Sequence, residues 1–536
     1  MSTQVAPREE APLARSTATI SAWNALSRVT GFARVLAVGA ALGTTFLGNT
    51  YQSSNLVSNL LFELLAAGLL SAPLVPAFVR LVDLHDREGA ERLAGQLLTL
   101  TLAVLGAVVL AGALAGRPVM HLLTLTVDGA GLRAREVALG AFFLWFFLPQ
   151  VLLYAVGAVA SALLNADRRF AAPAFAPVAN NLTVTATMIV FLAMRHGATP
   201  GLTLPLAQRL VLAIGTTGGV VAMTVVPVLA ARRAGFRLRP RRGFDSPDLR
   251  QVGRIGAWGA VLLAANQVLI GVTLVLANHV EGGVVAYQIA FTFFLLPVAL
   301  AAQPLFTALY PRLAAHAHGG RWAAFADDLA GGVRITTFLV LPASALLVVL
   351  GQPTLRLLRL GALSEHGAVL VAHVLAAYGL GLGGYALFML LARAAVAADD
   401  ARSPALVGAG ITVVGAVLMV TASAVTTGDD RVVALGVAHS IAMTGGAGVL
   451  LLLVRRRVGF PLPFASTAVR TLAVSGAAGA AAGFVVHVTN AAGRTGAAGA
   501  LVAGAATAAV LVLGGQLLLG APELRTAMQL VRGAAR

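Results

Sequence analysis

Apolar stretches of about 20 residues, separated by short polar connections, recur along the chain from residue 20 to residue 520. A helix of about 20 residues crosses the hydrocarbon core of a bilayer, which is about 30 Å thick. We therefore expect an all-α polytopic membrane protein. The pattern predicts about fourteen membrane-spanning helices, at residues 20–43, 55–79, 94–115, 137–164, 172–194, 208–231, 255–278, 284–311, 335–351, 367–392, 404–427, 432–454, 471–489 and 496–520.

The composition agrees with a chain that lies mostly within a membrane. Of its 536 residues, 58% are hydrophobic and 11% are charged, whereas about a quarter of the residues of a soluble domain are charged. The N-terminal segment Met1 to Arg15 lacks a small-residue cleavage site before a short apolar core, so we expect no cleaved signal peptide. The absence of cysteine excludes disulfides and thiolate metal sites.

The arginines are distributed unevenly between the two sides of the predicted helices. All 38 basic residues are arginine; 27 lie in the tails and loops on the side of the termini, and 8 lie in the opposite loops. Because loops rich in basic residues stay in the cytoplasm, we expect both termini to be cytoplasmic.

The longest polar connection, residues 232–254, contains eight arginines and two prolines and is interpreted as a cytoplasmic linker between two bundles. It lacks the regular interleaving of basic and aromatic residues that is typical of nucleic-acid binding, so we expect no nucleic-acid partner. The predicted organisation is a tail at 1–19, a six-helix bundle at 20–231, the linker at 232–254, a second six-helix bundle at 255–454, and two trailing helices with a tail at 455–536. Transporters of this organisation have halves that rock about a central cavity.

Three ionisable residues within the first two predicted spans are candidates for function, because a charge inside hydrocarbon usually faces a cavity or a partner. Arg28 and Arg34 lie six residues apart, hence about 120° apart around a helix. Either both extend to the headgroups, or the deeper Arg34 has a functional role. Glu63 is surrounded by apolar residues. It either forms a salt bridge with Arg34 or Arg28, or couples transport to an ion or substrate.

Short motifs that resemble those of soluble enzymes occur here in the wrong structural context. The glycine-rich run at 379–384 lies inside an apolar span instead of following a strand, and a chain without lysine has no Walker lysine. The ten histidines show no paired metal-ligand spacing. We therefore expect no enzymatic activity, no metal site and no cofactor, and coupling to the membrane potential or to a monovalent cation stays open.

Four segments resemble one known family, the MurJ/MviN lipid II flippases of the multidrug/oligosaccharidyl-lipid/polysaccharide exporter superfamily. The first is Ser27-Arg28-Val29-Thr30-Gly31-Phe32-Ala33-Arg34, similar to the family's Ser-Arg-x-x-Gly-x-x-Arg motif. The second is Ser58-Asn59 with Ala66-Ala67-Gly68 and Val75-Pro76. The third, which is the most specific, runs from Leu164-Asn165-Ala166-Asp167-Arg168-Arg169 through Pro173 and Pro177 to Asn181. The fourth runs from Arg393 through Asp400 to Ser403-Pro404.

The resemblance implies a flippase that moves the lipid-linked peptidoglycan precursor across the bacterial inner membrane by alternating access, with arginines gripping the diphosphate. The candidate substrate-binding residues are Arg28, Arg34, Asn49, Asn59 and Glu63. Asn165, Arg169, Pro173, Pro177, Arg393, Asp400 and Pro404 are the candidate structural or gating residues.

The chain also departs from the family pattern. Asn49 stands where the family usually has an acidic residue, Phe62 and Glu63 stand where basic residues are frequent, Ala67 replaces an acidic residue, and Thr292 lies where an arginine is expected. Two alternatives therefore stay open besides lipid II: another polyprenyl-diphosphate-linked glycan, or cation-coupled export of a drug or solute. A non-transporting scaffold is a third. Membrane lipids and cell-wall synthesis proteins are the other expected partners.

Overall fold

The computed structural model describes residues 11–64, 74–84, 86–241, 247–461, 463–489 and 493–524, and within these ranges it consists of helices and connecting turns. The chain forms two compact units. Unit 1 contains Met1–Ala41, Ser53–His121 and Ala134–Ala260, and unit 2 contains Leu42–Gln52, Leu122–Arg133 and Val261–Arg536. The division falls within a helix, after residue 260, and the interpretation of 232–254 as the boundary between bundles stays a prediction.

The helices that lie wholly or mostly in unit 1 come from the first half of the chain. They are α1 (Ala11–Leu42), α2 (Phe46–Phe62), α4 (Leu74–Asp83), α5 (Arg87–Leu114), α6 (Gly116–Leu123), α7 (Ala130–Phe147), α8 (Gln150–Ala166), α9 (Ala171–Met194) and α10 (Leu206–Arg233). Helix α11 (Pro247–Ala277) begins in unit 1 and ends in unit 2.

Unit 2 contains the remaining helices. They are α12 (Gly283–Pro297), the π-helical turn η2 (Val298–Ala302), α13 (Gln303–His318), α14 (Trp322–Leu357), α15 (Glu365–Gly379), α16 (Leu382–Ala397), α17 (Arg402–Val425), α18 (Asp430–Val458), α19 (Ala465–Thr489) and α20 (Gly493–Leu518).

Each of the fourteen predicted spans coincides with helix in the described residues. Eleven helices there are long and apolar enough to cross a membrane, and twelve are if the bent pair α15–α16 forms one span. The predicted span 255–278 is a shorter apolar helix, Val261–Ala277, by the same measure. Part of the span 55–79, with Ala66, Ala67 and Gly68, lies outside the described residues. The polytopic helical fold is confirmed, and the number fourteen is approximate.

Three predicted single spans are interrupted helices. Pro149 separates α7 from α8, and Pro297 precedes the π-helical turn between α12 and α13. Proline lacks the amide hydrogen that continues a helix. The third break is a bend of 48° between α15 and α16. It falls in the glycine-rich run, where Gly381 lies so close to Ser440 that an added Cβ would be 2.6 Å from the Ser440 backbone.

The core of unit 1 is formed by α4, α5, α8 and the segment after α10. Phe78, Leu97, Val159 and Leu163 are buried there together with Phe236. Helices α8 and α10 are also joined by a side-chain hydrogen bond, because the Thr224 hydroxyl donates to the carbonyl of Leu153 at 3.0 Å. This core holds the chain that leaves α10 against α5.

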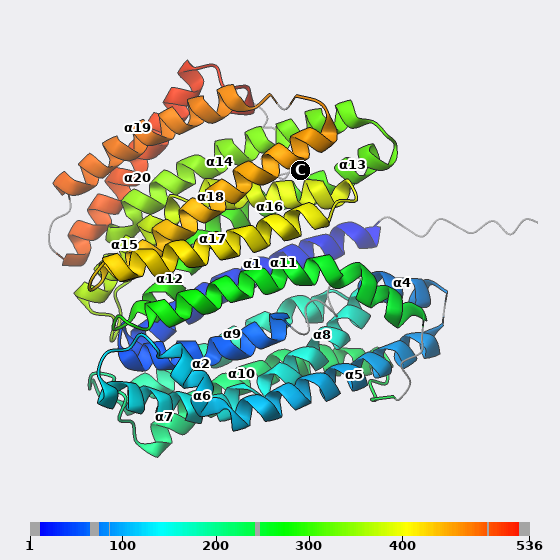
Figure 1. Ribbon diagram of the computed structural model, residues 1–536, viewed down its shortest axis with the longest axis vertical. Coiled ribbons are helices and arrows are strands. Elements are labelled where there is room, and N and C mark those ends of the chain that lie inside the picture. The colour runs from blue at the N-terminus through cyan, green and yellow to red at the C-terminus, as the bar shows by residue number, and fades with distance from the viewer. Residues whose placement is uncertain are drawn as a thin grey trace, which may run out of the picture. The chain divides into compact units, whose positions relative to one another are not determined.

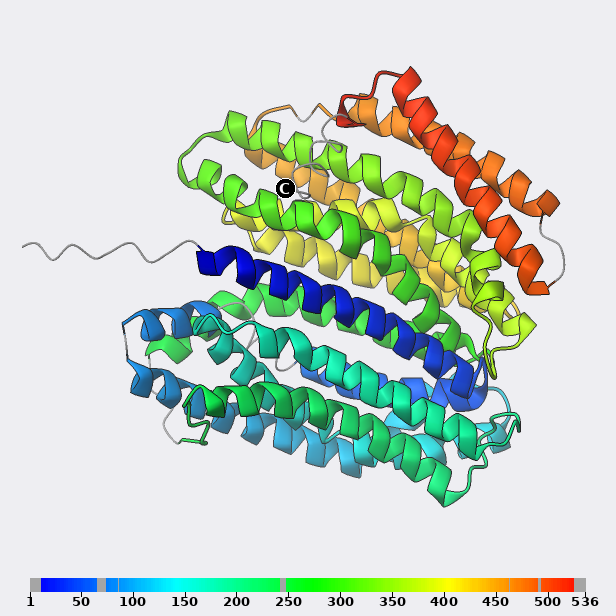
Figure 2. The ribbon, with the colours of Figure 1, turned by 180° about the vertical axis from the view of Figure 1, so that it is seen from behind.

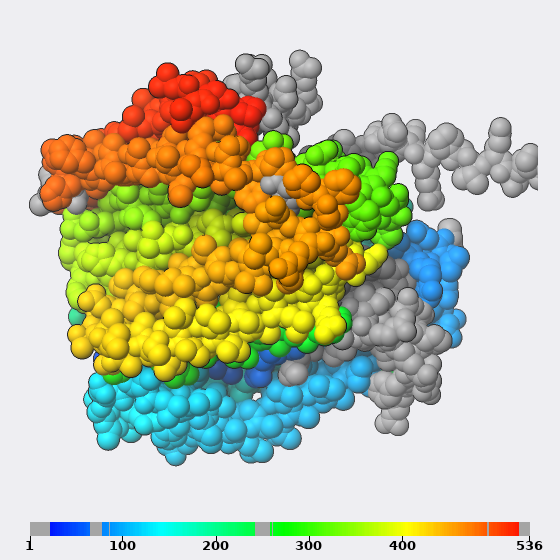
Figure 3. Space-filling model, turned by 45° about the horizontal axis from the view of Figure 1, so that its top comes forward, coloured from blue at the N-terminus to red at the C-terminus, as the bar shows by residue number. Residues whose placement is uncertain are grey.

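In unit 2, helices α19 and α20 form a hairpin that packs along α14 (Figure 1). The view from behind shows the same orange and red pair following the green α14 (Figure 2). The space-filling view shows that the pair covers part of α14 (Figure 3). Arg470 of α19 forms an ion pair with Glu523, whose side chain also accepts a hydrogen bond from Thr467 at 2.7 Å. This network joins α19 to the segment that follows α20.

Candidate functional site

The two arginines of the first motif both lie on α1 but differ in exposure. Arg28 is exposed and Arg34 is partly buried. Neither forms an ion pair with Glu63 within the part of the chain that the structure describes. The interpretation of Glu63 as the neutralising partner of these arginines therefore lacks support in this structure.

Helix α9 holds the motif of α1 in place. The side-chain amide of Asn181 donates to the carbonyl of Ser27 and to the hydroxyl of Thr30, both at 3.2 Å. Gly31 lies beside the same amide, and a Cβ there would be at van der Waals distance, 3.4 Å from it. The Trp23 and Phe175 rings meet edge to face, with centroids 4.9 Å apart. Trp23, Ser27 and Thr30 of α1 thus contact α9 beside the two arginines.

Arg34 lies near an aromatic pair that joins α2 to α8. The rings of Phe62 and Tyr154 have centroids 5.2 Å apart, and the charge of Arg34 acts on the Tyr154 phenol. Nothing about its apolar surroundings singles out Tyr154 in the sequence, so reasoning from the sequence missed it.

Asn59 and Glu63 lie on α2 and its continuation. Both are partly buried, and their spacing of four residues places them on the same side of the helix. The Glu63 carboxylate therefore lies on the same face of the helix as the Asn59 amide. Their predicted contact with substrate stays a prediction.

Asn49 lies in unit 2 and joins the beginning of α2 to the α11–α12 turn. Its side chain is fully buried, donates to the carbonyl of Val280 at 2.8 Å and accepts from the amide of Val284 at 3.0 Å. Gly282 in this turn has φ of 73°, and a Cβ there would lie 2.4 Å from Thr44. An amide suits this position because it donates and accepts at once, which a carboxylate does not. The substrate-binding role predicted for Asn49 is untested.

The third motif is the turn between α8 and α9. The amide of Arg169 donates to the carbonyl of Leu164 at 2.8 Å, and that of Arg168 to Asn165 at 3.1 Å. These are the two bonds of a Schellman motif, with Arg168 as the left-handed residue at φ of 59°. The side chain of Arg169 pairs with Asp167 at 2.8 Å. Asn165 and Arg169 thus build the end of α8.

Pro173 and Pro177 follow in α9. Pro173 is the third residue of the helix, where the missing amide hydrogen costs little because the first turn has no intrahelical acceptor. Pro177 lies inside the helix and removes one backbone bond, which is a site where α9 can bend.

The fourth motif, between α16 and α17, repeats this geometry in unit 2. Asp399 has φ of 57°; its amide donates to Val396 at 3.0 Å, and the amide of Asp400 donates to Ala395 at 2.9 Å. Pro404 is the buried third residue of α17, as Pro173 is the third of α9. The two motif turns therefore share one construction, a Schellman turn followed by a proline at the third position of the next helix.

Asp400 caps α17. Its carboxylate accepts from the Ser403 amide at 3.0 Å and from the Ser403 hydroxyl at 2.6 Å. Burial acts to raise the pKa of Asp400, but the hydrogen bonds from Ser403 and the charge of Arg457 outweigh it and lower the pKa below its ordinary value. Arg457 also donates to the carbonyl of Ala398 at 2.8 Å.

Arg393 lies over the Phe306 ring, 5.3 Å from its centroid.

Thr292, where an arginine was expected, donates its hydroxyl to the Gln288 carbonyl of its own helix at 2.8 Å. The positive charge that an arginine would place in α12 is thus absent at this position. Within the described residues no group of histidines and carboxylates could hold a metal ion.

Comparison with known proteins identifies the family. A family model described as "Lipid II flippase MurJ" matches residues 38–505. A probable lipid II flippase MurJ from Rhizobium meliloti is 28% identical over 442 residues, which are 82% of this chain and 80% of that protein. A lipid II flippase MurJ from Burkholderia cenocepacia is 27% identical over 416 residues, which are 75% of this chain and 77% of that protein.

Solved structures agree on the fold. A lipid II flippase MurJ in an inward closed conformation aligns with a TM-score of 0.73 at 17% identity, over 93% of this chain and 99% of that one. An inward-facing MATE transporter of the MOP superfamily aligns with a TM-score of 0.66 at 14% identity, over 81% of this chain and 94% of that one. With the family model covering most of its length, this multi-pass membrane protein belongs to the MurJ lipid II flippase family.

Proposed function

We propose that this protein moves lipid II from the cytoplasmic to the outer leaflet of the bacterial inner membrane for peptidoglycan synthesis. The match of residues 38–505 to the family model is the observation that carries the proposal. The positions of Arg28 and Arg34 support it, because two guanidinium groups without an ion pair to Glu63 suit the diphosphate of a lipid-linked precursor. We infer that the protein transports without chemical catalysis and without a cofactor.

The driving force belongs to the same proposal. Lipid II carries negative charge, so its movement outward is favoured by a membrane potential that is negative inside. Inward movement of a monovalent cation would also drive lipid II outward if the two movements were coupled. Cell-wall synthesis proteins that use the flipped precursor are the expected protein partners.

The orientation proposed is cytoplasmic for both termini, in line with the arginine distribution. Because the chain contains no cysteine, single cysteines report the sidedness of one position at a time. A cysteine in place of Arg233 should be protected from a membrane-impermeant thiol reagent in whole cells, and one in place of Gly129 should react. The reverse labelling would reject this orientation.

The function is tested by rescue of a strain depleted of its own lipid II flippase. We expect growth to return and lipid II to stop accumulating when this chain is expressed. A lipid II flipping assay in vesicles, with and without an imposed potential, then separates the flippase from its driving force. Correct membrane expression without rescue, together with no flipping in vesicles, would reject lipid II as the cargo.

A further inference from the structure

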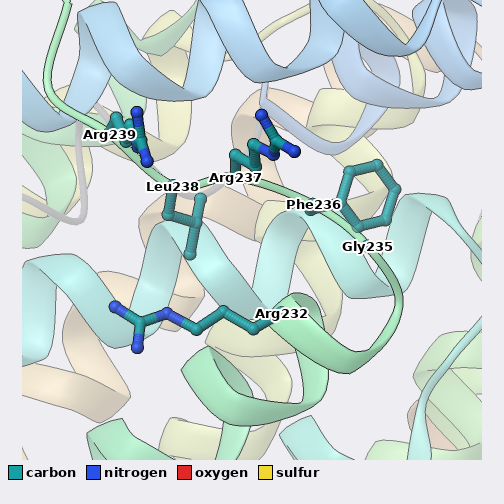
Figure 4. Close-up of a pocket in the computed structure, with 6 residues that line it drawn as sticks. All are labelled: Arg232, Gly235, Phe236, Arg237, Leu238 and Arg239. Atoms are coloured by element: carbon teal, nitrogen blue, oxygen red, sulfur yellow. The ribbon is translucent and has the colours of Figure 1, made fainter.

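A pocket of about 570 Å³ lies at the segment that follows α10, in unit 1. Its lining residues are Arg232, Gly235, Phe236, Arg237, Leu238 and Arg239 (Figure 4). The close-up shows Arg232 extending from the end of α10, and Arg237 and Arg239 extending from the segment beyond it. Three of the six lining residues are arginines, and none is acidic.

This segment is fixed to α5 by hydrogen bonds that are donated from both segments. The Arg237 amide donates to the Glu91 carboxylate at 2.9 Å, and the Arg241 amide donates to the Gly95 carbonyl at 3.1 Å. The hydroxyl of Thr99 donates to the carbonyl of Arg241 at 2.8 Å. Gly95 permits this approach, since a Cβ there would lie 2.5 Å from the Arg239 carbonyl. The backbone that carries the arginines is therefore held in place before any ligand binds.

The apolar side of the segment is anchored as well. Phe236 is 4% exposed and belongs to the core of unit 1. Arg87 of α5 lies over its ring, 4.4 Å from the centroid, and also donates to the Ala234 carbonyl. The Arg87 side chain is thus bound to the Phe236 ring and to the Ala234 carbonyl, and it does not line the pocket.

The pocket arginines have unused binding capacity. Arg232, Arg237 and Arg239 are exposed, and among the described residues none forms an ion pair with a carboxylate. Glu91, the carboxylate that contacts the segment, is bound to a backbone amide. Three positive charges that line one pocket without a carboxylate partner favour the binding of an anion there. Guanidinium groups match phosphate oxygens in geometry as well as in charge.

The position of the pocket points to the source of the anion. Arg232 and Arg233 form the last turn of α10, a membrane-spanning helix, so the pocket lies where the apolar part of the helix ends. That is the level of the lipid headgroups. We propose that this pocket binds the phosphate group of an acidic membrane lipid.

The test uses the full-length protein in nanodiscs of phosphatidylcholine with or without phosphatidylglycerol. Native mass spectrometry counts the retained phosphatidylglycerol, and a third arm adds inorganic phosphate to phosphatidylcholine nanodiscs and follows the unfolding temperature. The pocket variant is Arg232→Gln/Arg237→Gln. The matched control is Arg233→Gln/Arg456→Gln, which removes two exposed arginines that do not line the pocket.

We expect the wild type and the control to retain phosphatidylglycerol, and the pocket variant to bind it about 30-fold more weakly. Arg232→Lys/Arg237→Lys should restore part of the binding, which separates lost charge from misfolding. Equal retention by the pocket variant, or equal loss in the control, would overturn the proposal. Stabilisation by inorganic phosphate alone, lost in the pocket variant, would keep the phosphate site and overturn the lipid as its source.

Discussion

Arg168 and Asp399 occupy equivalent positions in the two units. Each is the left-handed residue of the turn that ends one helix, with φ of 59° and 57°, and each precedes by five residues the proline at the third position of the next helix. The turn between α8 and α9 and the turn between α16 and α17 therefore end the first helix and start the second in the same way. In both turns the left-handed residue allows the last carbonyls of the first helix to be hydrogen-bonded, and the proline is tolerated because the first turn of a helix has no intrahelical acceptor for its amides.

The left-handed conformation of Arg168 predicts an unusual pair of substitutions. Glycine adopts this conformation without the steric cost of a Cβ, which is about 1 kcal/mol. Arg168→Gly should therefore raise the thermal unfolding midpoint of the purified protein, whereas the β-branched Arg168→Val should lower it. A lower midpoint for the glycine variant would show that the Arg168 side chain contributes more than its conformation costs.

The hydrogen bonds of Asn181 predict a role in joining α9 to α1. Asn181→Ala removes both bonds to α1, and we expect a loss of about 1 kcal/mol in the free energy of unfolding. Thr183→Ala is the control, because the Thr183 hydroxyl bonds to the carbonyl of its own helix. Thermal unfolding in detergent measures both. Equal stability of the two variants would contradict the role of Asn181 as the link.

Arg34 is expected to be required for transport. Arg34→Ala removes a charge-assisted contact with the diphosphate, worth about 1.5–3 kcal/mol, and should abolish rescue of a flippase-depleted strain. Arg34→Lys keeps the charge but not the planar fork, so partial rescue is expected. Arg233→Ala, on an exposed arginine at the end of α10, should leave rescue unchanged. Full rescue by Arg34→Ala, with normal expression, would remove Arg34 from the substrate site.

Asp400 predicts a dependence of stability on pH. Because the folded protein lowers the pKa of Asp400, its capping interaction stabilises the protein above the ordinary pKa of an aspartate and is lost as the pH falls through the lowered value. At neutral pH, Asp400→Ala should cost about 1 kcal/mol in the free energy of unfolding.

The control for this prediction is Asp400→Asn. It keeps an acceptor for the Ser403 amide and should be less destabilising at neutral pH, but its stability should change less than that of the wild type between neutral and acid pH. Unfolding midpoints measured across that range distinguish the variants. An unchanged acid profile in Asp400→Asn would show that Asp400 does not produce the effect.

The amino-acid sequence by itself determined the membrane-spanning helices. A run of about 20 apolar residues is a local property, and in a bilayer it has few structures available besides a helix. The same local reasoning found Arg28, Arg34 and Glu63, because charges stand out against an apolar background. The four family motifs were also visible in the sequence, but their three-dimensional arrangement was not.

Only the tertiary structure decided what those motifs do. Asn49 and Asn181 bind residues 231 and 154 positions away in the chain, and the sequence does not contain that proximity. Whether Glu63 pairs with Arg28 or Arg34 also depends on tertiary packing, and neither pair forms in the described part of the chain. Tyr154 pairs with Phe62 only because folding brings α8 to the end of α2. Hydropathy is set residue by residue, whereas a hydrogen bond between two helices depends on how they pack.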